Sequence, residues 1–137
     1  MLRPETRSRA RAFQLLYAWE TQGRPSLDEV VPGVAHLVRP SPTELDGALA
    51  LCEAAIAKQT TLDELIGRAS EHWRHDRIGL AERLILRIAA VELTQELAPP
   101  RVVIDEALWL TRRFASPSAV PFINGILDRV ARDLGQL

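Results

Sequence analysis

The stretch from Leu80 to Leu97, LAERLILRIAAVELTQEL, constrains the fold more than any other part of the chain. Placed on a helix at about 100° per residue, its apolar side chains leave no broad polar face. A helix that is apolar nearly all round is normally buried on most sides, so we expect it to be the central helix of a bundle. Pro99 and Pro100 are expected to end it, because proline cannot continue a helix. The residues expected in the core are Leu84, Ile85, Leu86, Ile88, Val91 and Leu93.

The remaining segments also show helical periodicity and helix-start signals. A first helix is predicted from Thr6 to about Thr21, another from Val103 to Phe114, and a last one after Ser116 and Pro117. Serine or threonine followed three residues later by glutamate has the spacing of a capping box, which opens a helix. No segment alternates apolar and polar residues at period two, so the predicted fold is all-α. The capping-box pairs are Ser26 with Glu29, Ser41 with Glu44, and Thr61 with Glu64.

Size and composition indicate one domain spanning residues 1–137. The chain has 137 residues, of which 47% are hydrophobic, enough for a core that needs no metal or disulfide. Its single cysteine, Cys52, cannot form an internal disulfide, which fits a reducing compartment. The sequence has neither an apolar run of about 18 residues nor a signal-peptide pattern, so we expect a cytoplasmic protein.

The start of the chain is rich in arginine although the formal net charge is only -1. Positive charge at the start of a helix is unfavourable unless an anion lies nearby, because the helix dipole is positive there. Guanidinium groups hold phosphates through paired hydrogen bonds and stack on unpaired bases, so an RNA-binding surface is predicted. The alternative is a solvated helix start. The arginines concerned are Arg3, Arg7, Arg9 and Arg11.

Gly125 lies inside the last predicted helix, where glycine costs about 0.5–1 kcal/mol relative to alanine. Something is therefore expected to require its missing side chain. From the residues alone, the first interpretation is a close helix crossing with Phe122 in the core.

Metal binding and catalysis are not expected. His72, His75 and Asp76 have a spacing that can converge on an ion, but no further histidine or cysteine completes a zinc ligand set. The sequence contains no glycine-rich phosphate loop after a strand and no recognisable catalytic motif. We therefore predict no cofactor, no metal and no enzymatic activity.

Several segments, in this order and spacing, resemble the NusB family of bacterial transcription antitermination factors. They are RARAFQLLYAW at 9–19, TLDELI at 61–66, HWRHDRIGLAERLILRIAAVEL at 72–93, PPRVVIDEALWLTRRF at 99–114 and FINGILD at 122–128. The resemblance implies an all-α fold of about seven helices in two packed sub-bundles. It also implies binding of the boxA element of nascent RNA together with NusE, a ribosomal protein that doubles as an antitermination factor. The complex would be delivered to RNA polymerase during ribosomal RNA transcription.

The resemblance also implies roles for individual residues. It assigns RNA binding to the four arginines and to Ser118, Phe122, Asn124 and Gly125, with an edge of Phe122 available for base stacking. It assigns partner binding to Tyr17 and to Glu82, which is expected on an exposed strip of the central helix. On that strip, Arg83 and Arg87 are expected to pair with acids such as Asp76.

Three positions depart from the family pattern. Asp105 replaces a common asparagine, Trp109 an acidic residue, and Val91 a common tyrosine. Trp109 is interpreted either as partner surface, such as a homodimer contact, or as a core residue. Two other functions are considered. One is a structural self-association domain that uses Trp109, and the other is an accessory domain of RNA modification machinery, since some RNA methyltransferases carry a NusB-like domain.

Overall fold

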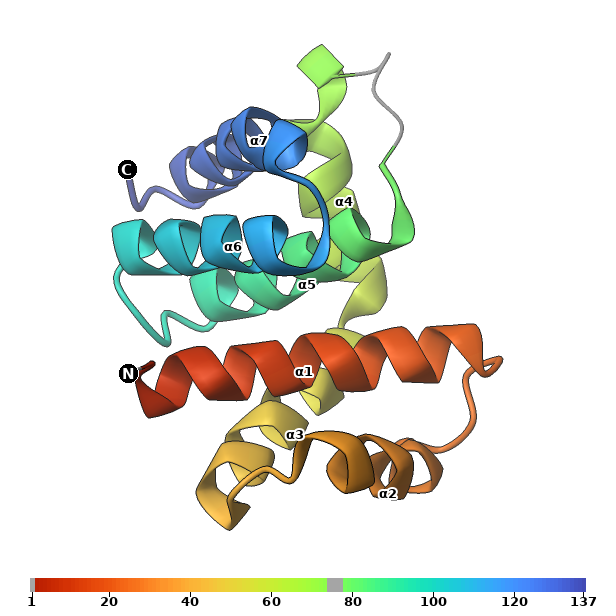
Figure 1. The fold of residues 1–137 in the computed structure, drawn as a ribbon. Coiled ribbons are helices and arrows are strands. Elements are labelled where there is room, and N and C mark those ends of the chain that lie inside the picture. Colours follow the sequence, from red (N-terminus) through yellow and green to blue (C-terminus); the bar gives the residue numbers. More distant parts are fainter. Residues whose placement is uncertain (1, 74–77) are drawn as a thin grey trace. The chain divides into compact units, whose positions relative to one another are not determined.

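The protein is all-helical in a computed structural model that describes residues 2–73 and 78–137. These residues form seven α-helices, two short 3-10 helices and no strand, as predicted (Figure 1). The chain divides into two compact units, Met1–Glu53 and Ala54–Leu137. The elements are α1 (Pro4–Thr21), α2 (Leu27–Val38), α3 (Pro42–Ala57), α4 (Gln59–Ala69), η1 (Glu71–Trp73), α5 (Leu80–Thr94), α6 (Pro100–Phe114), η2 (Pro117–Ala119) and α7 (Val120–Asp133).

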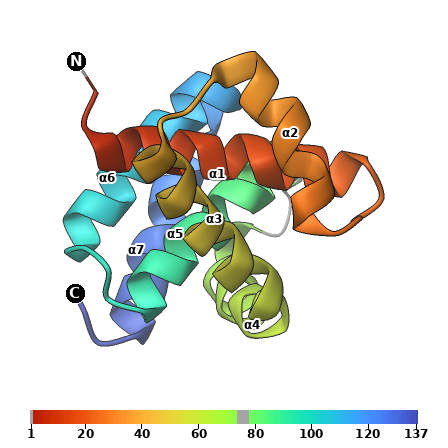
Figure 2. The same cartoon turned by 90° about the horizontal axis from the view of Figure 1, so that it is seen from below.

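In the first unit, α2 packs against α1 (Figure 2). Local hydrogen bonds fix where α2 and α3 begin. The backbone N–H of Ser26 donates to Glu29 Oε2 at 3.1 Å, which confirms the first capping box. The second is also confirmed, because Ser41 N donates to Glu44 Oε2 and Glu44 N donates to Ser41 Oγ, both at 3.2 Å. Two of the predicted helix starts therefore rest on the expected chemistry.

Cys52 is buried in the same unit, and its thiol donates to the backbone oxygen of Ala12 at 3.5 Å. Burial, with a smaller contribution from the charge of Glu53, raises the pKa of Cys52 to about 12. Thiol reactivity depends on the thiolate, so the packed side chain is unreactive near neutral pH.

The third predicted capping box is wrong. Thr61 lies inside α4, which begins at Gln59 directly after α3. The backbone N–H of Leu62 already donates to the Lys58 oxygen at 3.0 Å, so the helix has started before Thr61 could cap it.

In the second unit, α4, α6 and α7 pack around α5, which confirms the central helix (Figure 1). Ten consecutive residues of α5, from Leu84 to Leu93, are buried. The predicted end at the two prolines is wrong, because α5 already ends at Thr94. Glu96 adopts the left-handed conformation with φ 52°, and Leu97 N donates back to the Glu92 oxygen at 3.0 Å. This local turn ends α5, and the prolines instead open α6.

Arg87 and Glu92 are charged residues within this buried stretch, each 5% exposed. The guanidinium of Arg87 forms two hydrogen bonds with the carboxylate of Asp63 on α4, at 2.9 and 3.0 Å. The expected placement of Arg87 on an exposed strip is therefore wrong, and its partner is Asp63. Asp76, which we expected as a partner, lies outside the described residues. Arg83 is exposed and donates to the Ile78 oxygen at 3.3 Å.

None of the helices that the structure describes combines the length and the apolar character needed to cross a membrane.

Replacing Asp63 by alanine is expected to lower the free energy of unfolding by about 1–3 kcal/mol, because it leaves the buried Arg87 guanidinium without its carboxylate. The loss stays below that of a fully buried pair, since the Asp63 side chain is 39% exposed. Urea unfolding measures it. Adding Arg87→Met to Asp63→Ala should restore much of the stability, and Glu64→Ala, an exposed change on the same helix, serves as the control. Equal stability of Asp63→Ala and the control would contradict the assignment.

Candidate nucleic-acid interface

The arginines at the start of α1 do not all face solvent. Arg3 is the exposed N-cap residue, Arg7 and Arg11 are half-buried, and Arg9 is only 5% exposed. We expected all four arginines to bind RNA directly, and this is wrong for Arg9, because its side chain is buried. The reason lies in the helical period, because Arg9 shares the i, i+4, i+7 stripe of the buried Phe13 and Leu16.

Arg3, Arg7 and Arg11 remain on one face of α1, because residues four apart are neighbours on a helix. We call this the arginine face. They lie at and after the positive end of the α1 dipole, where backbone N–H groups lack helical acceptors. The Nε atom of Arg11 is buried and has no hydrogen-bond partner among the described residues. This face has the charge and the donors to hold an anion such as phosphate.

Glu44 of α3 fixes the position of Arg7. Its Oε1 atom lies 3.2 Å from Arg7 Nε, while its Oε2 atom accepts the capping hydrogen bond from Ser41. The guanidinium of Arg7 also donates to the Leu2 oxygen at 2.8 Å. One carboxylate therefore caps α3 and neutralises part of the arginine face.

A pocket of about 360 Å³ lies in the second unit, where α5, η1, η2 and the start of α7 meet. We call it the Glu82 pocket. It brings together Glu82, which was predicted to bind a protein partner, with Ser118 and Phe122, which were predicted to bind RNA. The described residues that line it are Trp73, Glu82, Ser116, Ser118, Ala119, Pro121 and Phe122.

Phe122 is buried, with 8% of its surface exposed. Its ring meets the Trp73 indole edge to face, with centroids 5.7 Å apart. The expected stacking of an RNA base on Phe122 is therefore corrected, because a base needs an open ring face. The structure instead agrees with the alternative that Phe122 belongs to the core.

Gly125 is explained by the same indole. A Cβ atom built at Gly125 would lie 2.8 Å from Cζ2 of Trp73, so only glycine leaves room for this packing. Asn124 is exposed on the neighbouring position of α7. Of the predicted residues on α7, Asn124 is thus the one that presents its side chain to solvent.

The two predicted partner residues lie in different units. Tyr17 of α1 is 43% exposed and its ring contacts that of Phe13, with centroids 5.9 Å apart. Glu82 of α5 is half-buried, and a Cβ atom built at Gly79 would lie 2.5 Å from its Oε2 atom. Glycine at residue 79 thus lets the carboxylate lie over the start of α5.

Trp73 and Ser116 line the pocket but were not predicted to bind RNA or protein. The Ser116 and Ser118 hydroxyls are 2.7 Å apart, and Ser118 N donates to Ser116 Oγ at 3.2 Å, which caps η2. Gly125 signalled that a bulky neighbour was required. That signal did not identify Trp73, which comes from a different part of the chain.

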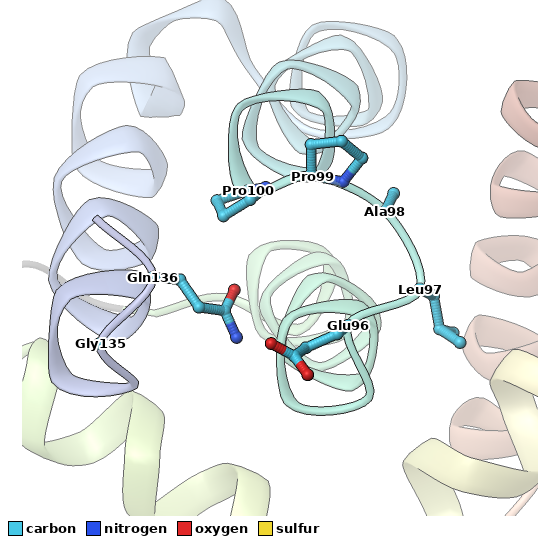
Figure 3. A pocket seen from close by; sticks show the side chains of 7 residues that line it. All are labelled: Glu96, Leu97, Ala98, Pro99, Pro100, Gly135 and Gln136. Carbon is cyan, nitrogen blue, oxygen red and sulfur yellow. The ribbon is translucent and has the colours of Figure 1, made fainter.

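A second pocket of about 570 Å³ lies where α5 and α7 end and α6 begins (Figure 3). The side chains of Glu96 and Gln136 point toward one another across its opening. Gln136 Nε2 donates to the Leu93 oxygen at 2.7 Å, which ties the end of the chain to α5. None of the residues predicted to bind RNA or protein lines this pocket.

Replacing Glu44 by glutamine should keep the capping hydrogen bond but release Arg7, since glutamine can also occupy a capping box. The Arg7 side chain is 38% exposed and that of Glu44 is 10% exposed. A partly exposed ion pair is worth about 0.2–1 kcal/mol, so RNA affinity at low salt is expected to rise by up to about fivefold. Fluorescence anisotropy measures the change. Glu29→Gln alters the equivalent capping position on α2 and is the matched control, because Glu29 forms no ion pair with an arginine among the residues that the structure describes. The same affinity for both variants would argue against the arginine face.

Comparison with known proteins identifies the family. A sequence model of the NusB family matches residues 6–132. The transcription antitermination protein NusB of Nitratidesulfovibrio vulgaris is 41% identical over 139 residues, which cover 95% of this chain and 90% of that protein. The Solibacter usitatus protein of the same name is 36% identical over 129 residues, covering 93% and 88%.

The fold agrees with this assignment. The structure of T. maritima NusB superimposes with a TM-score of 0.82 at 28% identity, covering 97% of this chain and 94% of that one. Both comparisons span nearly the whole sequence, as did the resemblance seen in the sequence segments. The chain belongs to the NusB family of transcription antitermination proteins.

Proposed function

We propose that the protein binds boxA-type single-stranded RNA together with NusE and helps deliver the ribosomal protein to RNA polymerase during ribosomal RNA transcription. The observation that carries the proposal is the placement of Arg3, Arg7 and Arg11 on one face at the positive end of α1. Nothing in this function requires covalent chemistry. It requires only two surfaces of modest affinity that act together.

The proposal assigns a charged RNA contact to the first unit and a polar RNA contact to the second unit. The three arginines hold phosphates, and Arg9 supports the helix from its buried side. Exposed Asn124 on α7 can donate to and accept from a base edge. Ser118, Phe122 and Gly125 then act by shaping the start of α7.

The proposal assigns one protein contact to each unit, Tyr17 in the first and Glu82 in the second. Tyr17 offers a large, partly exposed ring with one hydroxyl, a combination enriched in interfaces. The ring contact with Phe13 limits its motion, so less conformational entropy is lost on docking. Glu82 adds a negative charge suited to a basic ribosomal protein.

Fluorescence anisotropy of a labelled boxA-type RNA, with and without purified NusE, tests the proposal. We expect RNA binding that strengthens when NusE is present. The triple variant Arg3→Ala, Arg7→Ala, Arg11→Ala should bind more weakly and flatten the dependence of log affinity on log salt by about 2, since single strands contribute about 0.7 per phosphate contact.

The control is Arg68→Ala, Arg101→Ala, Arg112→Ala, which removes the same charge from exposed positions of the second unit. Equal effects of the two triple variants would contradict the arginine face. An absence of binding by the unmodified protein, together with tight self-association, would favour a structural oligomer instead.

A further inference from the structure

We propose that the pocket where α5 and α7 end and α6 begins binds an aliphatic ammonium ion. The ion is either a free polyamine or the end of a lysine side chain of another protein, which share an ammonium group on a flexible alkyl chain. This inference goes beyond the proposed function, because no residue assigned to RNA or NusE lines the pocket. We call it the Glu96 pocket, and the described residues that line it are Glu96, Leu97, Ala98, Pro99, Pro100, Gly135 and Gln136.

α5 and α7 both end at this pocket with the same backbone hydrogen bond. After α5, Leu97 N donates to the Glu92 oxygen at 3.0 Å. After α7, Gln136 N donates to the Ala131 oxygen at 2.9 Å. A bond of this span defines a Schellman motif, in which the residue before the donor has a positive φ. The carbonyl ends of two helices, which carry partial negative charge, therefore lie beside one pocket.

Glutamate occupies the positive-φ position after α5, where α7 has glycine. Glu96 has φ 52° and Gly135 has φ 75°. Glycine adopts this conformation without a steric penalty, whereas the Cβ atom of any other residue makes it unfavourable. Because the turn itself needs no side chain at residue 96, we attribute the strained glutamate to the function of its carboxylate.

The Glu96 carboxylate has no cation of its own. Its side chain forms no ion pair or hydrogen bond with the described residues, and none of those that line the pocket is basic. The last turn of α5 contains no basic residue, and in the last turn of α7 Arg132 Nε already donates to Asp128 Oδ2 at 2.8 Å. The negative charge at the pocket is therefore not compensated among the residues that the structure describes.

The start of α6 does not turn the pocket into an anion site. Pro100 has no N–H. The N–H groups of Val102 and Val103 both donate to the Pro99 oxygen, at 3.0 and 3.1 Å. An anion would thus meet few free donors and would be repelled by Glu96. The chemistry of the pocket selects a cation.

Gln136 supplies a second oxygen on the opposite side. Its Nε2 atom donates to the Leu93 oxygen at 2.7 Å, which fixes the amide, and its Oε1 atom accepts no hydrogen bond from the described residues. The side chains of Gln136 and Glu96 point toward one another across the opening (Figure 3). An ammonium nitrogen carries three donors in different directions, whereas the donors of a guanidinium lie in one plane. Acceptors that face one another therefore favour an ammonium group.

The rings of Pro99 and Pro100 add an apolar wall (Figure 3). The alkyl chain of a lysine or a polyamine can rest on such a wall while its charged end bonds to the polar side. The volume of about 570 Å³ exceeds what an ammonium group alone needs and lies within the range of small-ligand sites. The pocket therefore fits the alkyl chain as well as the charge.

NMR titration of the full chain with putrescine, followed through the backbone amides, tests the inference. We expect saturable shifts at Glu96, Leu97 and Gln136 that weaken as salt is raised, because the contact is electrostatic and partly exposed. Butanediol, which has the same chain length and no charge, is the control ligand. A blocked tripeptide with lysine between two alanines forms the second arm. Tighter binding of putrescine identifies a free polyamine as the source of the ion, and tighter binding of the peptide identifies a protein lysine.

Glu96→Gln keeps the length of the side chain and removes its charge, so affinity for putrescine is expected to fall about fivefold at low salt. Glu96→Gly should weaken binding at least as much and also raise the thermal midpoint, since glycine relieves the strained backbone. Loss of binding in a more stable variant separates the role of the carboxylate from that of the fold. Glu64→Gln, an exposed change on α4, is the control and should bind putrescine as the unmodified protein does.

Three results would each overturn the inference: no saturable shifts with either amine, equal shifts with butanediol, or unchanged affinity in Glu96→Gln. None of them bears on the proposed function, which RNA and NusE binding test separately.

Discussion

Burial of α5 is the constraint on which the second unit depends. Ten consecutive residues of that helix are buried, so α4, α6 and α7 must cover it from several sides. Arg87 lies within this stretch and would be costly there alone, but the Asp63 carboxylate pairs with it through two hydrogen bonds. The pair therefore fixes α4 against α5 by geometry as well as by apolar contact. With that packing in place, the first turn of α5 can carry Glu82 to the edge of a pocket.

In the first unit, the arginines at the start of α1 also require compensation of their charge. That helix begins with arginines that would repel one another and the helix dipole, and the structure distributes them over different environments. Arg9 is buried, Arg7 is paired with Glu44, and Arg3 remains exposed at the helix start. The same Glu44 caps α3, so one side chain both stabilises the helix start and lowers the charge of the arginine face. The ion pair of Glu44 thereby lowers the positive charge beside Arg7.

Local sequence patterns predicted the all-helical fold, the central helix and two capping boxes, because these depend on neighbouring residues. Patterns of that kind did not predict the end of α5, which depends on the left-handed backbone of Glu96. Nor did they reveal the pairing of Arg87 with Asp63, or the packing of Trp73 over Gly125, because both contacts join separate segments. In the candidate site, residue identities came from family resemblance, whereas their burial and grouping required the structure.

Hydrogen exchange of the protein with each ligand alone tests most directly whether RNA and protein partner use different surfaces. Mass spectrometry would follow backbone amides at the start of α1, and at Gly79–Leu84 and η2 beside the Glu82 pocket. The account predicts that RNA alone slows exchange at the start of α1, whereas NusE alone slows exchange beside the pocket. Protection beside the pocket by RNA alone, with none from NusE, would contradict it.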